Sequence, residues 1–117
     1  MTSKELAFEA VKILDNKKAE DITLIEIEEL TIIADYFLLA SATSNTHAKS
    51  LIEELEFQLE QKGVRADHIE GRASGWTLMD YGNVLIHIFE KDSREYYNLE
   101  RLWSDAAVVD IKDLLTD

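Results

Sequence analysis

The chain has 117 residues, 46% of them hydrophobic, and contains no cysteine. This length predicts one domain over residues 1–117 with a single core, and the lack of cysteine excludes disulfides, thiolate zinc sites and a Cys nucleophile. The 24 acidic and 12 basic residues give a net charge of -12, which argues against broad direct nucleic-acid binding because phosphate contacts require Lys and Arg.

The same charge suits a basic protein partner, although solubility alone also explains it. No secretory leader is recognisable, and no apolar run reaches the roughly 20 residues needed to span a bilayer. We therefore expect a cytoplasmic protein that does not insert into membranes.

Helix and strand patterns alternate through the first half of the chain. A capping box from Thr2 to Glu5, followed by apolar residues at helical spacing, predicts a helix from residue 3 to about Asn16. The β-branched segment 22–27 predicts a strand, and the near-continuous apolar run 36–42 predicts a central strand buried on both faces. Side-chain oxygens at residues 43–46 then precede an apolar stripe that predicts a helix ending near Gly63.

Three strands and a helix are predicted in the second half, at residues 68–70, 76–80, 84–89 and 92–103. Residues 104–117 form a C-terminal extension of uncertain structure, in which 106–111 reads as a short strand or as the tail of a helix. The fold class is α/β, α+β-like, with a mixed five-stranded sheet flanked by helices.

Asp80 and His87 are the first candidates for catalysis. The two residues lie on either side of a tight turn, with Asp80 near the turn and His87 deeper in its strand. The sequence places no Ser, Thr or Tyr within reach of His87 to act as a nucleophile. We expect His87 to be a core histidine that is hydrogen-bonded to a neighbour.

Two further patterns raise enzyme alternatives. Ser44 at a strand-to-helix junction, together with Asp80 and a metal, would suit nucleotidyl or phosphoryl transfer, but no glycine, Lys or Asp-x-Asp pattern accompanies it. His68 and Glu70 share one strand face and would suit a metal-dependent hydrolase, although a solvated or salt-bridged pair is the commoner arrangement. We expect Ser44 to be a helix cap and predict no catalytic, cofactor or metal site.

Aromatic residues cluster late in the chain. Trp76 begins a strand and Tyr81 lies at a turn tip, where side chains are often exposed, so both are candidates for an interface. Tyr96, Tyr97 and Trp103 are expected to pack the last helix against the sheet.

Five short motifs follow one another in the chain: residues 34–37 (Ala-Asp-Tyr-Phe), 41–44 with His47, 70–71 with Trp76, 80–84 with His87 and Phe89, and Arg94 and Tyr97 with 99–103 (Leu-Glu-Arg-Leu-Trp). In this order they resemble the ribosomal silencing factor family, also called Iojap-like, over residues 3–103. Ala42 stands where that family usually has Gly, and Asn83 where it usually has Asp. These departures bear on local turn geometry.

The resemblance implies a nucleotidyltransferase-like core without catalytic carboxylates, and a protein that is not an enzyme. It implies binding to large ribosomal subunit protein fourteen, which would block association of the large and small subunits and lower translation under nutrient limitation. The partner-binding residues carried over are Trp76, Asp80 and Tyr81, with Glu70 as an acidic neighbour.

The resemblance also makes a homodimer possible, because family members are often dimeric. His47, Asp35 and Arg94 match family motif positions too. We interpret these three residues as structural hydrogen-bond partners.

Overall fold

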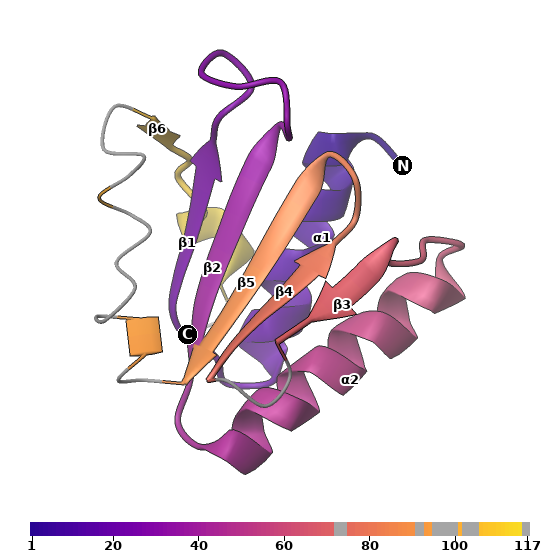
Figure 1. Cartoon of the computed structure of the whole chain (residues 1–117), viewed down its shortest axis with the longest axis vertical. Helices are drawn as coiled ribbons and strands as arrows, with labels where there is room; N and C mark the ends of the chain where they lie inside the picture. Colours follow the sequence, from indigo (N-terminus) through magenta and orange to yellow (C-terminus); the bar gives the residue numbers. More distant parts are fainter. Residues whose placement is uncertain (72–74, 91–92, 95–100, 102–105, 116–117) are drawn as a thin grey trace.

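Six strands form one mixed sheet in the computed structural model, in the order β3-β4-β5-β2-β1-β6 (Figure 1). The structure describes residues 1–71, 75–90, 93–94, 101 and 106–115. The elements are α1 (Ser3–Asn16), β1 (Glu20–Glu26), β2 (Tyr36–Ala42), α2 (Asn45–Gln61), β3 (His68–Glu70), β4 (Trp76–Asp80), β5 (Val84–Glu90), β6 (Ala107–Val108) and the 3-10 helix η1 (Lys112–Leu114).

The two central strands, β2 and β5, run parallel, and every other pair of neighbouring strands is antiparallel. All seven residues of β2 are buried, as expected for a strand covered on both faces. Helices α1 and α2 pack on one face of the sheet, where their apolar stripes join the larger core cluster. A smaller cluster that includes Phe37, Leu39 and Phe89 lies on the opposite face.

Both helices begin as their sequences predict. The Thr2 hydroxyl accepts a hydrogen bond from the Glu5 backbone N–H at 3.1 Å, and the Glu5 carboxylate accepts one from the Thr2 N–H at 2.8 Å. This reciprocal capping box satisfies two donors that the first turn leaves unpaired. At α2 the Ser44 hydroxyl accepts from the His47 N–H at 3.0 Å, so the prediction that Ser44 is a helix cap is confirmed.

The predicted α+β architecture is confirmed, but the predicted number of strands is wrong. A sixth strand, Ala107–Val108, pairs with Ile25 and Glu26 at the edge of the sheet. Two residues are too short to show a periodic pattern, so the sequence left this segment open between strand and helix. Most of the predicted helix 92–103 lies outside the described residues, and the likeness to nucleotidyltransferases stays a prediction.

The helices among the described residues are too short or too polar to cross a membrane.

Candidate protein-docking face

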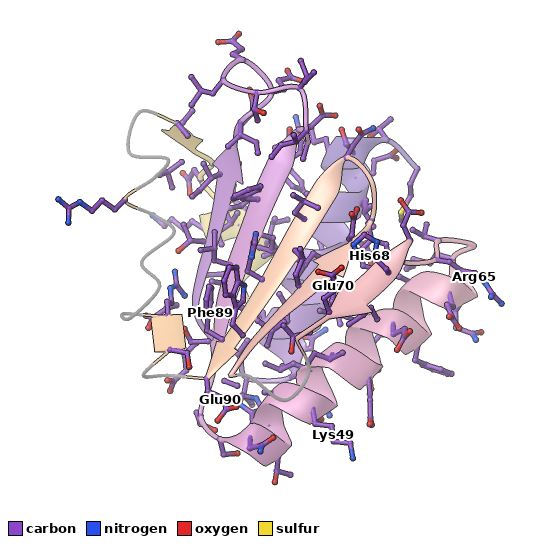
Figure 2. All side chains as sticks on the ribbon, in the orientation of Figure 1. Lys49, Arg65, His68, Glu70, Phe89 and Glu90 are labelled. Carbon is purple, nitrogen blue, oxygen red and sulfur yellow. The ribbon has the colours of Figure 1, made fainter. Side chains whose placement is uncertain are left out.

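Strand alternation places Trp76, Leu78 and Asp80 on the face of β4 that points away from the helices. These three side chains are half-buried, whereas Thr77 and Met79 between them are buried, and Met79 joins the helix-side core. In β3, His68 pairs with Asp80 and Glu70 pairs with Leu78, and directly paired residues project to the same side of a sheet. We call the surface formed by His68, Glu70, Trp76, Leu78 and Asp80 the β3–β4 face. Figure 2 labels His68 and Glu70 on this face.

Trp76 is fixed in place by two neighbours on β5. Its ring stacks on Phe89, with centroids 5.7 Å apart and planes inclined by 18°, and lies 5.9 Å from the His87 ring. The indole Nε1–H donates a hydrogen bond to His87 Nδ1 at 3.0 Å. One part of the indole is therefore packed and hydrogen-bonded, while another part remains accessible at the surface.

His87 is the buried support beneath Trp76. Because Nδ1 accepts from the indole, the neutral imidazole carries its proton on Nε2, which has no hydrogen-bond partner within the described part of the chain. Burial lowers the pKa of His87 from 6.5 to about 4, and the Phe37 ring lies 4.9 Å away. The prediction of a hydrogen-bonded core histidine is confirmed, and an imidazole with Nδ1 engaged in this way is poorly suited to be a general base.

Carboxylates lie at the outer part of the β3–β4 face. His68 Nε2 lies 3.4 Å from Glu70 Oε1 and 3.6 Å from Asp80 Oδ2, so the expected pairing of His68 with Glu70 is confirmed. Asp80 Oδ1 also accepts from the Gly82 N–H at 2.8 Å, which ties this carboxylate to the turn. The part of the chain that the structure describes contains no group of three His, Cys, Asp or Glu residues arranged to hold a metal.

Tyr81 is buried, so the expectation that this side chain is exposed at the turn tip is wrong. Alternation along β4 continues one residue beyond Asp80 and directs Tyr81 into the helix-side core, where it is 9% exposed. Burial, and then the nearby carboxylates Glu56 and Glu60, raise the pKa of Tyr81 to about 12. Three of the four predicted partner-binding residues, Glu70, Trp76 and Asp80, therefore share one face, and Tyr81 lies behind it.

The residues of the transferase alternative do not meet. Ser44 follows Ala42, which pairs with Glu90 at the end of β5, whereas Asp80 pairs with Leu85 near the start of β5. The two side chains thus belong to opposite ends of the sheet, too far apart to hold one metal.

His47 connects the two helices. The Thr43 backbone N–H donates to His47 Nδ1 at 2.9 Å, and Nε2 contacts the Lys17 carbonyl oxygen at 2.7 Å. An accepting Nδ1 leaves the proton on Nε2, which therefore donates to that carbonyl. The end of α1 is joined to the start of α2 through one imidazole, in agreement with the structural interpretation of His47.

Asp35 and Arg94 also have structural partners. The Ser3 hydroxyl donates to Asp35 Oδ2 at 2.8 Å, which fastens the first residue of α1 to the segment before β2. The buried Arg94 guanidinium donates to the Ser41 hydroxyl at 3.1 Å and to the Thr23 hydroxyl at 3.0 Å. The structural interpretations of Asp35 and Arg94 are confirmed.

Leu78 was missed as a member of the β3–β4 face. The signal was present, because period-2 alternation from Trp76 through Leu78 to Asp80 places all three on one side. Leu78 adds apolar area between the indole and the carboxylates.

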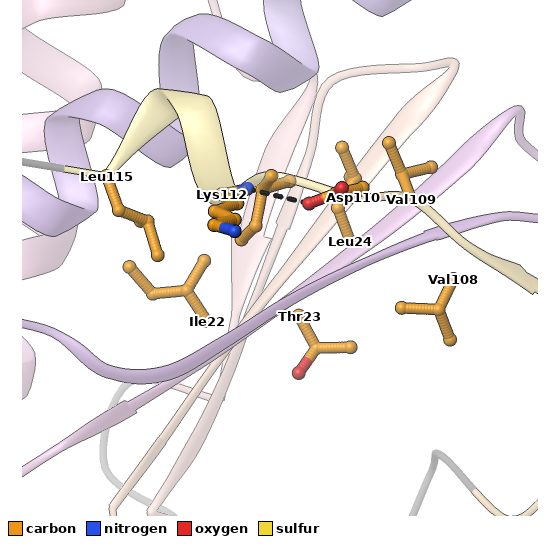
Figure 3. A pocket seen from close by; sticks show the side chains of 9 residues that line it. Ile22, Thr23, Leu24, Val108, Val109, Asp110, Lys112 and Leu115 are labelled. Atoms are coloured by element: carbon orange, nitrogen blue, oxygen red, sulfur yellow. Dashed lines mark hydrogen bonds between the residues drawn. The ribbon is translucent and has the colours of Figure 1, made fainter.

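A separate hollow of about 370 Å³ lies between β1 and the C-terminal residues (Figure 3). Two charged residues, Asp110 and Lys112, are part of its lining. The Lys112 N–H donates to Asp110 Oδ1 at 3.0 Å, so this carboxylate closes a local turn. The mainly aliphatic lining suits packing of the C-terminal segment on β1: Ile22, Thr23, Leu24, Val108, Val109, Ile111 and Leu115.

Comparison with known proteins gives a consistent result. The family model described as "Ribosomal silencing factor during starvation" matches residues 1–117. Ribosomal silencing factor RsfS of Bacillus subtilis is 37% identical over 112 residues, 95% of each chain. A crystal structure of a protein from Chromobacterium violaceum superposes with a TM-score of 0.85 at 30% identity, covering 89% of this chain and 88% of that one.

A more distant relative is "Mitochondrial assembly of ribosomal large subunit protein 1" of Mus musculus. It is 33% identical over 98 residues, which cover 80% of this chain and 43% of the mouse protein. The sheet order, the positions of the motif residues and these matches lead to one conclusion: the chain belongs to the ribosomal silencing factor family, whose named role is regulation of translation rather than catalysis.

Proposed function

We propose that this protein represses translation by binding large ribosomal subunit protein fourteen through the β3–β4 face, which prevents the small subunit from joining. One observation carries the proposal. A Trp side chain, held from behind by His87 and Phe89, lies on the same face as Glu70 and Asp80. An ordered, partly accessible Trp on a face that also carries carboxylates is a common composition of an interaction hot spot.

The chemistry of the face also favours a basic protein partner. Carboxylates at the rim of an interface select a positively charged partner and orient it during association. A large-subunit partner agrees with the name of the mouse relative, which refers to assembly of that subunit. Tyr81 is not part of the docking surface in this proposal, because its buried ring lies in the helix-side core. The proposal places the protein in the cytoplasm, where it would meet ribosomes.

Trp76→Ala tests the proposal. Removing the indole deletes the central apolar contact, and we expect binding to purified large subunits at least about tenfold weaker, since truncation of a hot-spot residue commonly costs about 2 kcal/mol or more. Co-sedimentation in sucrose gradients measures binding, and a reassociation assay with small subunits measures repression.

Phe57→Ala is the matched control, because Phe57 is an exposed aromatic residue on α2 (60% exposed), away from the β3–β4 face. Thermal unfolding of both variants establishes that each remains folded. Equal co-sedimentation of Trp76→Ala and the wild-type protein would refute the assignment of this face.

A further inference from the structure

The loop between β1 and β2 exposes several aliphatic side chains at one end of the molecule. Ile32 is fully exposed, Ile33 is 59% exposed and Leu30 is 48% exposed. Val108 on β6 is 68% exposed and pairs with Ile25 near the end of β1. We call Leu30, Ile32, Ile33 and Val108 the apolar tip; the loop and β6 lie at the same end of the sheet in Figure 1.

Hydrogen bonds give the loop a defined shape. The Leu30 and Thr31 N–H groups donate to the Ile27 carbonyl oxygen at 2.9 and 3.1 Å, and the Ile33 N–H donates to the Thr31 hydroxyl at 3.2 Å. A turn closed in this way holds its aliphatic side chains outward before any partner binds. A group of exposed aliphatic side chains is typical of an interaction surface, because exposing apolar area to water is unfavourable unless a partner covers it.

A small hollow beside the apolar tip has the lining expected of a site for a Lys or Arg side chain. Its volume is about 120 Å³, and it is lined by Leu30, Ala106 and Ala107 together with Glu26 and Glu29. Apolar walls suit the methylene stem of a long cation, and two carboxylates suit its charged end.

The loop and the strands that flank it carry negative charge. Residues 19–48 include six acidic residues and neither Lys nor Arg. Such a surface repels RNA phosphates and anionic lipids, and it disfavours a second copy of the same surface. A protein surface that presents Lys or Arg next to apolar residues is the complementary partner.

The loop adjoins one end of the β3–β4 face. The N–H groups of Asp35 and Tyr36 both donate to the Asn83 carbonyl oxygen, at 2.8 and 3.1 Å, and Asn83 belongs to the turn that follows Asp80. A partner that covers Asp80 therefore extends naturally toward the loop.

We infer that the apolar tip and the Glu26–Glu29 hollow form a second docking surface, which takes a Lys- or Arg-bearing protein surface of the large ribosomal subunit. This inference rests on the proposed function, since the large subunit is the partner in both. The tip supplies apolar anchors, and the hollow holds one cationic side chain of the partner.

The experiment measures binding to purified large subunits for two variants, Ile32→Ser/Ile33→Ser and Glu29→Lys. Matched controls are Phe57→Ser and Glu53→Lys, which alter exposed residues of α2 in the same ways. We expect each loop variant to bind about tenfold more weakly, as for loss of an interface anchor, and each control to bind as the wild type does. A photo-reactive phenylalanine at position 32, with position 57 as its control, should cross-link to a ribosomal protein.

Three results would overturn the inference. Wild-type binding by both loop variants, alongside weakened binding by Trp76→Ala, would refute the second surface and leave the proposed function intact. Cross-links from position 32 to ribosomal RNA alone, or to a second copy of this chain, would refute the assigned partner. Failure of the wild-type protein itself to bind large subunits would refute the proposed function and this inference together.

Discussion

His87 shows how one buried side chain holds a surface residue in place. Its Nδ1 accepts the indole proton of Trp76, and its ring lies between the aromatic rings of the second core cluster. Protonation would require a second N–H at Nδ1, which faces the Trp76 donor, and would place a positive charge in a site that is 4% exposed. The neutral imidazole is therefore the form that supports the β3–β4 face.

The titration of His87 predicts how stability depends on pH. The pKa is about 4 in the folded chain and 6.5 in its ordinary state, so the unfolded chain binds more protons between these values and stability falls as the pH falls below 6.5. The difference limits the loss to about 3 kcal/mol. Urea unfolding of the wild type and of His87→Gln at several pH values measures it. Parallel pH profiles for the two proteins would contradict the prediction.

Tyr81→Phe separates a core role from a docking role. The Tyr81 hydroxyl is buried with no hydrogen-bond partner among the described residues, and an unsatisfied buried polar group costs about 1–3 kcal/mol. We expect Tyr81→Phe to leave the free energy of unfolding unchanged or to raise it by about 1 kcal/mol, and to leave large-subunit binding unchanged. Chemical denaturation and co-sedimentation measure the two quantities. Weaker binding by a variant of undiminished stability would return Tyr81 to the docking surface.

At the scale of elements, β4 enters and leaves the sheet through glycines. Gly75 and Gly82 both have φ of +81°, a left-handed conformation that costs most other residues about 1 kcal/mol or more. A Cβ at Gly75 would lie 2.5 Å from the Ser93 hydroxyl oxygen, whereas the nearest atom to one at Gly82 is 3.7 Å away. Both turns therefore require a positive φ, but only the turn at Gly75 lacks room for a side chain.

A pair of alanine substitutions tests this difference. We expect Gly82→Ala to lower the free energy of unfolding by about 1 kcal/mol through backbone strain, and Gly75→Ala to lower it further through the contact with Ser93. Ser93→Ala in the Gly75→Ala background should recover the additional loss. A double-mutant cycle by thermal unfolding gives the coupling, and additive effects would show that Ser93 moves aside at no cost.

The elements differ in how far their sequences predict them. Capping oxygens at Thr2 and Ser44 mark both helix starts, and the apolar run of β2 predicts its burial, because these signals are local. The pairing of β2 with β5 depends on contacts between distant segments, which no local pattern records. The side on which Tyr81 lies follows from period-2 alternation beyond Asp80, but the sequence does not show that this alternation continues into the turn. The β3–β4 face was predicted as separate residues, and the registers of β3 and β4 are what bring Glu70, Trp76 and Asp80 together.

At the scale of the whole molecule, charge governs how a partner is approached. The net charge of -12 gives a long-range attraction toward basic surfaces, and salt weakens that attraction by screening. The apolar contacts of Trp76 act at short range and depend much less on salt. The association rate should therefore depend on ionic strength more strongly than the dissociation rate does.

We expect the association rate with isolated large ribosomal subunit protein fourteen to fall about tenfold between low and physiological ionic strength, because electrostatic steering is lost, while the dissociation rate changes less. Stopped-flow or surface-binding kinetics over a salt series measures both rates. Glu70→Gln should reduce the slope for association, because it removes one charge from an exposed position. Equal salt dependence of the two rates would argue against steering by this charge.

The late position of β5 in the chain determines when the β3–β4 face is completed during protein synthesis. His87 and Phe89 hold Trp76 in place, and both belong to β5. This strand follows β3 and β4 in the chain. A nascent chain that ends before β5 has the Trp but lacks its support and the centre of its sheet. Under the proposed function, docking to a large subunit therefore begins only after β5 has been synthesised and has paired with β2.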